Sequence, residues 1–94
     1  DMNTTKQINT LERRQLELKA VMQKSDEHAL KCAKSGLDFR KTYPDDWTAY
    51  EAARVKYNEN ETALAALYEQ LAAEEEAAQA AMMSAMAAGI TPEG

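Results

Sequence analysis

Cysteine, proline, glycine and β-branched aliphatic residues are all scarce in this chain of 94 residues. It has one cysteine, two prolines and three glycines, and isoleucine and valine together number four. A single cysteine excludes a disulfide within the chain, and so few β-branched residues disfavour a sheet. No basic-then-apolar signal segment is visible near the start. We therefore expect a cytoplasmic protein with no β-structure.

Alanine, by contrast, is abundant, with eighteen residues, and the chain is acidic. Sixteen acidic and eleven basic side chains give a formal charge of −5, and 45% of the residues are apolar. That apolar share is too high for a disordered tail, while the apolar residues are too scattered for a membrane span. Because alanine is the strongest helix former, we expect one all-α domain over residues 1–94. A chain of this length is only marginally stable without further support.

Two long segments of helical periodicity flank one break. In the first, residues recur at alternating spacings of three and four, which is typical of a heptad seam. The members of this seam are Ile8, Leu11, Gln15, Leu18, Met22, Ser25, Ala29, Cys32, Gly36 and Phe39. Thr4 and Gln7 fit a capping box at the helix start. Gly36 would suit an earlier helix end, but Phe39 stays in register, so we expect this helix over about residues 4–41.

Pro44 marks the break, because proline cannot continue a helix. We expect a turn at 42–45 and a second helix over about 46–88, with Asp45 or Asp46 as its N-cap. Gly89 and Pro92 supply the stop, and residues 89–94 form a short tail.

Folding the chain at this break predicts a long antiparallel two-helix hairpin that resembles a coiled coil. Residues whose numbers total about 86 then face each other. This register places Ser25 opposite Glu61 and Leu18 opposite Tyr68. Because the second helix is the longer one, its end should overhang.

Two apolar features have no partner within such a hairpin. Leu16, Leu30 and Leu37 lie at multiples of seven beside the main seam, and ten of the twelve residues 77–88 are alanine or methionine. Unpartnered apolar surface on a small domain predicts assembly into a dimer or a larger helical bundle.

Aromatic residues gather near the break. Tyr50 and Tyr57 are expected in the core, and Tyr43 and Trp47 at an interface. Our candidates for a partner interface are therefore Leu16, Leu30, Leu37, Tyr43, Trp47, Met82, Met83 and Met86.

The sequence offers little for catalysis or metal binding. His28 and Cys32 stand four apart and share a helix face, so two such pairs across a dimer would suit zinc; a small buried thiol in the seam is the stronger interpretation. No catalytic triad or Gly-rich phosphate loop is present.

We expect no enzyme activity, no cofactor, no bound metal and no small-molecule substrate. Acidic residues interleave with the basic ones, so nucleic acid is not an expected partner, and neither is a membrane.

The leading hypothesis is a non-enzymatic helical interaction or assembly protein that associates with itself or with another helical protein. Small bacterial or phage accessory proteins, chaperones and scaffold-like subunits all fit. The alternative is an acidic inhibitor that mimics nucleic acid and binds a basic protein. The carboxylates of the second expected helix, over about residues 46–88, would carry that activity: Glu51, Glu59, Glu61, Glu69, Glu74, Glu75 and Glu76. A metal protein built on His28 and Cys32 is the third hypothesis.

Overall fold

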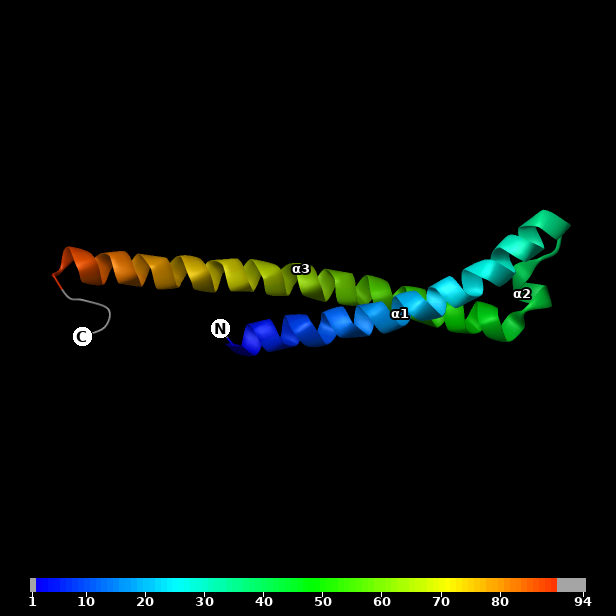
Figure 1. Ribbon diagram of the computed structural model, residues 1–94, viewed down its shortest axis with the longest axis horizontal. Helices are drawn as coiled ribbons and strands as arrows, with labels where there is room; N and C mark the ends of the chain where they lie inside the picture. The colour runs from blue at the N-terminus through cyan, green and yellow to red at the C-terminus, as the bar shows by residue number, and fades with distance from the viewer. Residues whose placement is uncertain (1, 90–94) are drawn as a thin grey trace.

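The computed structural model describes residues 2–89 and contains three α-helices in that range (Figure 1). α1 spans Met2–Ser35, the short α2 spans Phe39–Thr42, and α3 spans Pro44–Ala87. α1 and α3 lie antiparallel against each other in an elongated molecule measuring 73 × 17 × 16 Å. No strand occurs in residues 2–89, so the predicted all-α hairpin is confirmed. No described helix is apolar over a stretch long enough to cross a bilayer.

The free end of α3 projects beyond the start of α1, as predicted. Near the start of α1, the Thr4 hydroxyl donates a hydrogen bond of 2.9 Å to Glu74. The remainder of α3, residues 75–87, continues past this point as a single helix of about 20 Å, which Figure 1 shows in orange and red. We call residues 75–87 the overhang.

α1 ends at Ser35, six residues before the predicted end at Lys41. Gly36 adopts the left-handed conformation with φ of +68°, and the Leu37 amide donates to the Cys32 carbonyl at 2.9 Å. This six-to-one hydrogen bond closes a helix end of the Schellman type. The alternative that Gly36 terminates the helix is therefore the correct one, and Phe39 starts α2 instead of continuing α1.

The helix starts also differ from the prediction. α1 already begins at Met2, so Thr4 is not its cap and is buried against α3. α3 begins at Pro44, not at about residue 46, because the missing N–H and fixed φ of proline suit a first helical turn. Asp45 and Asp46 lie in that turn, where the helix dipole favours carboxylates.

The end of α3 agrees with the prediction. Gly89, with φ of +79°, follows α3, while Pro92 and the other residues of 90–94 lie outside the described residues.

The earlier turn shifts the register of the hairpin, so the predicted pairing was wrong by about two to four helical turns, depending on the position along the seam. The Ser25 hydroxyl faces the Asp46 carbonyl at 3.5 Å, not Glu61. The Tyr68 hydroxyl donates to Glu12 instead of lying opposite Leu18. A turn placed at Gly36 brings each residue of α1 against an earlier residue of α3, which accounts for the direction of the shift.

The core between α1 and α3 is thin and half polar. Among residues 2–89, the buried apolar side chains are Ile8, Cys32, Ala53 and Leu64, and the buried polar ones are Thr4, Gln15, Ser25 and Asn60. The leucines and aromatic residues expected to fill the core, including Leu11, Leu18, Tyr50 and Tyr57, are only half-buried. Two helices can cover only one stripe of each other, so this interior supplies little hydrophobic stabilisation.

One polar layer of the core specifies how the helices align. The Gln15 amide nitrogen donates to the Tyr57 carbonyl and to the Glu61 carboxylate, both at 3.0 Å. The Gln15 amide oxygen and the Asn60 amide nitrogen are buried without a hydrogen-bond partner among the described residues. Such groups cost stability, and a buried amide at a seam position favours one register over its neighbours.

Replacing Gly36 by alanine tests the position of the turn. Nothing lies within 4 Å of an added Cβ, so its cost is conformational. We expect Gly36→Ala to lower the free energy of unfolding by about 1 kcal/mol, because L-alanine resists a positive φ. Gly36→Asn should lose less, since asparagine tolerates this conformation better. Urea unfolding measures both. A Gly36→Ala protein as stable as the parent would show that the turn does not depend on this φ.

Candidate association surfaces

The predicted leucine stripe is exposed, but one member lies outside α1. Leu16 and Leu30 on α1 have 68% and 57% of their surface exposed, and Leu37 has 55%. Leu37 follows Gly36, so it belongs to the turn and does not extend the stripe along the helix. The leucine stripe of α1 therefore consists of Leu16 and Leu30.

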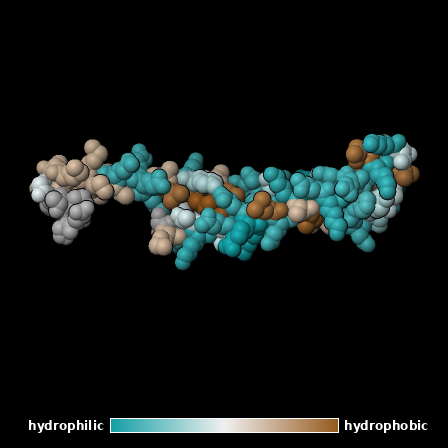
Figure 2. All heavy atoms as spheres, viewed as in Figure 1, coloured by the Kyte–Doolittle hydropathy of each residue, from teal (hydrophilic) through white to brown (hydrophobic). Residues whose placement is uncertain are grey.

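The overhang is a second exposed apolar surface. Met82, Met83 and Met86 have 52%, 71% and 62% of their surface exposed. Residues 77–87 contain no charged side chain, and Figure 2 shows the tan colour of apolar residues gathered over this end of the molecule. An isolated helix that is apolar on every side is normally buried against other helices.

The aromatic residues at the tip of the hairpin pack against one another. Tyr43 stacks on His28, with ring centroids 4.3 Å apart and an interplanar angle of 2°. Phe39 lies 6.3 Å from Tyr43 and meets Trp47 edge-on at 6.1 Å. The Arg40 guanidinium sits 5.9 Å from the Trp47 ring. Tyr43 and Trp47, predicted as interface residues, therefore contribute to this packing and remain half-buried. His28 and Phe39 were not predicted to join them.

His28 and Cys32 occupy different surroundings although they share a face of α1. The Cys32 thiol is free and only 2% exposed, inside the seam as predicted. His28 pairs through Nδ1 with the Asp46 carboxylate and stacks on Tyr43. Within residues 2–89, no three histidine, cysteine, aspartate or glutamate side chains come together as a metal site would require.

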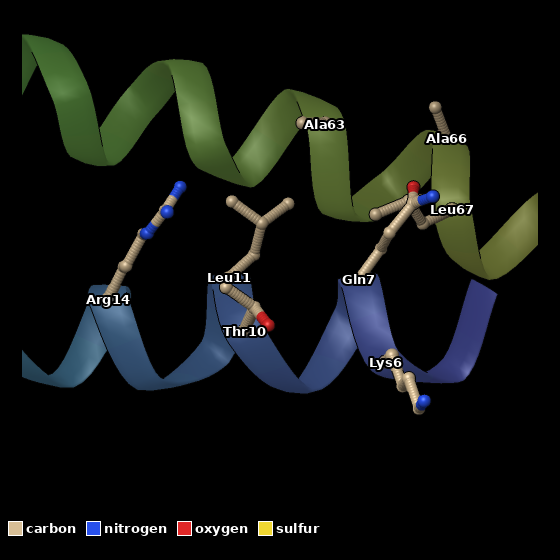
Figure 3. Close-up of a pocket in the computed structure, with 8 residues that line it drawn as sticks. All are labelled: Lys6, Gln7, Thr10, Leu11, Arg14, Ala63, Ala66 and Leu67. Atoms are coloured by element: carbon tan, nitrogen blue, oxygen red, sulfur yellow. The ribbon is translucent and has the colours of Figure 1, made fainter. Parts of the chain in front are cut away.

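A groove of about 550 Å³ runs along one side of the hairpin. Its lining residues are Lys6, Gln7, Thr10, Leu11, Arg14, Ala63, Ala66 and Leu67. Figure 3 shows Leu11 and Arg14 reaching from α1 toward α3, while Lys6 points away at the rim. We call this the basic groove, because its lining includes two cations and no carboxylate. Its lining depends on the register of the two helices, so the groove could not be predicted from spacing along either helix.

A second groove, of about 570 Å³, has the opposite charge. Its lining residues are Glu12, Gln15, Leu16, Glu61, Leu64, Ala65 and Tyr68. The Tyr68 hydroxyl donates to the Glu12 carboxylate, and this hydrogen bond, with a smaller effect of desolvation, raises the pKa of Tyr68. We call this the acidic groove, since it contains two carboxylates and no cation.

Several of the carboxylates proposed for nucleic-acid mimicry are already engaged. Glu51 accepts two hydrogen bonds from Arg54, at 3.2 and 2.9 Å, and this pairing lowers the pKa of Glu51. Glu59 lies 3.6 Å from the Lys56 ammonium.

Two other members of this set contact α1. Glu61 accepts a hydrogen bond in the seam, and Glu74 accepts one near the start of α1. Glu69, Glu75 and Glu76 are exposed. The seven residues therefore do not present one uniform row of free charges.

Comparison of the chain with protein-family models, with curated protein sequences and with solved structures gives no match. Its function is therefore inferred from the surfaces of the hairpin itself.

Replacing His28 tests whether the tip is held by its side chain. We expect His28→Ala to lower the free energy of unfolding by about 1 kcal/mol, because it removes the stack on Tyr43 and the pair with Asp46. Trp47 fluorescence should also change, since the aromatic cluster loosens. Lys31→Ala, at an exposed position on the next turn of α1, is the control. Equal stability of the two variants would show that the stack contributes nothing.

Proposed function

We propose that this chain is a non-enzymatic assembly protein that acts by helix–helix association with further copies of itself. The main support is the contrast between its thin core and its exposed apolar side chains. Six of the eight interface candidates are more than half exposed: Leu16, Leu30, Leu37, Met82, Met83 and Met86. Exposed apolar side chains that gather at one place on a protein surface, as the methionines of the overhang do, are typical of protein–protein interfaces. The single free cysteine accords with a cytoplasmic setting.

Association would supply the buried apolar surface that the hairpin lacks. Four buried apolar side chains among the described residues are few for a domain of this length. A neighbouring helix packed on either apolar surface extends the hydrophobic interior and removes the methionines or leucines from water. In this proposal the leucine stripe and the overhang form separate contacts, because they lie at different positions along the length of the hairpin.

The acidic-inhibitor hypothesis receives less support from the arrangement of charges. Glu51 and Glu59 have basic partners on the same helix, and Glu61 is tied to Gln15. Salt distinguishes the two hypotheses, since exposed charge pairs are screened by ions whereas apolar contacts are not. A partner that binds only at low salt would favour the inhibitor.

Light scattering at low and high salt tests the proposal. We expect the parent protein to be a dimer or larger at both salt concentrations. Leu30→Glu should lower the native mass, because it places a carboxylate in an apolar contact. Val21→Glu is the matched control: Val21 is also an exposed apolar residue of α1, at 40%, and helical spacing puts it on the face opposite Leu30.

Each possible result bears on a defined part of the proposal. A parent protein that is monomeric at both salt concentrations would contradict self-assembly. An assembly whose mass is the same for Leu30→Glu as for Val21→Glu would remove the leucine stripe from the interface.

A further inference from the structure

We propose that the overhang of one copy docks in the basic groove of a second copy, whose own overhang docks in the basic groove of the first. This inference rests on the proposed function, because it specifies one contact through which the chain would assemble. It makes each overhang the third helix of a short three-helix bundle in the other copy.

The overhang is long enough to cover the groove, and both are apolar where they would meet. The overhang provides about 20 Å of helix, whose last eleven residues, 77–87, are uncharged. The groove runs from Lys6 to Arg14 along α1, which is about 12 Å of helix. Its floor is apolar, with Leu11 and Leu67 between the helices (Figure 3). A third helix packed there would cover these side chains, which the hairpin leaves half-buried.

Charge selects the basic groove over the acidic one. The overhang begins with Glu75 and Glu76. It ends at the C-terminus of α3, which has no basic residue in its last turn. Free carbonyls give such an end partial negative charge. The basic groove offers two cations, whereas the acidic groove would set Glu12 and Glu61 against this negative helix. Like charges across an interface are unfavourable.

Side-chain size also permits the contact. Ala63 and Ala66 form the α3 wall of the groove, and the overhang carries Ala77 and Ala80 at compatible helical spacing. Small residues on both sides allow the two helices to approach closely. The flexible methionines of the overhang would then fill the irregular space at the groove edges.

Reciprocal docking determines the orientation. Each copy can dock its overhang on the other only if a two-fold axis perpendicular to α3 relates the two copies. The two α3 helices then run antiparallel. The uncharged end of each overhang then comes near Arg14 of the second copy, and Glu75 and Glu76 come near its Lys6. A cation beside a helix C-terminus and a cation beside glutamates are both favourable.

Cross-linking between two single-cysteine substitutions tests this arrangement. Ala66→Cys places a thiol in the groove and Ala80→Cys places one on the overhang, while the native Cys32 stays buried. The two proteins are mixed and treated with a short bis-maleimide. We expect the mixture to form covalent dimer at least about tenfold faster than either protein alone, because a short linker needs two nearby thiols. Ala52→Cys, an exposed site on α3 outside the groove, replaces Ala66→Cys in the control mixture.

Two outcomes would overturn the docking. Equal cross-linking in the Ala66→Cys and Ala52→Cys mixtures would show that the overhang does not reach the groove. Rapid cross-linking of Ala80→Cys by itself would show that overhangs pair with each other. Light scattering on the same samples separates the two proposals: an intact assembly with either outcome overturns the docking alone, whereas a monomeric parent overturns self-assembly as well.

Discussion

Every other feature of the hairpin depends on the single seam along which α1 and α3 meet. Two helices can bury only one stripe of each other, so few side chains leave water completely. Four of the buried residues among 2–89 are apolar and four are polar. Larger apolar side chains such as Leu11 and Leu67 lie half-buried beside the seam, where a further helix would cover them. The exposed leucines and methionines are thus a consequence of having one seam and no second layer.

The turn at Gly36 determines the register between α1 and α3, and contacts along the seam stabilise that register. A left-handed glycine ends α1 at Ser35, and its position determines which residues of α3 each residue of α1 meets. Gln15 stabilises that register by donating to both Tyr57 and Glu61. The same register decides where α1 begins along α3, and therefore how much of α3 overhangs. The length of the unpartnered helix and the composition of the two grooves follow from one backbone conformation.

Features that depend on local periodicity were predictable from the sequence, and features that depend on register were not. The seam residues Ile8 and Cys32 and the exposed Leu16 and Leu30 follow from spacing along one helix. That α3 overhangs follows from its greater length, while the extent of the overhang depends on the register. The end of α1 was mispredicted because Phe39 continues the apolar period, whereas the capping hydrogen bond at Gly36 prevails. That error moved every contact between the helices. The basic groove and the stack of His28 on Tyr43 require the correct turn, so no sequence pattern alone indicated them.

The hairpin is proposed to complete its hydrophobic interior by association, and unfolding at a series of protein concentrations is the direct test of this proposal. Association stabilises the folded state by mass action, so the urea midpoint of an assembled protein depends on concentration. We expect a midpoint that rises steadily as the protein concentration is raised over about a hundredfold range. A midpoint that stays constant over that range, with a monomeric mass throughout, would contradict it.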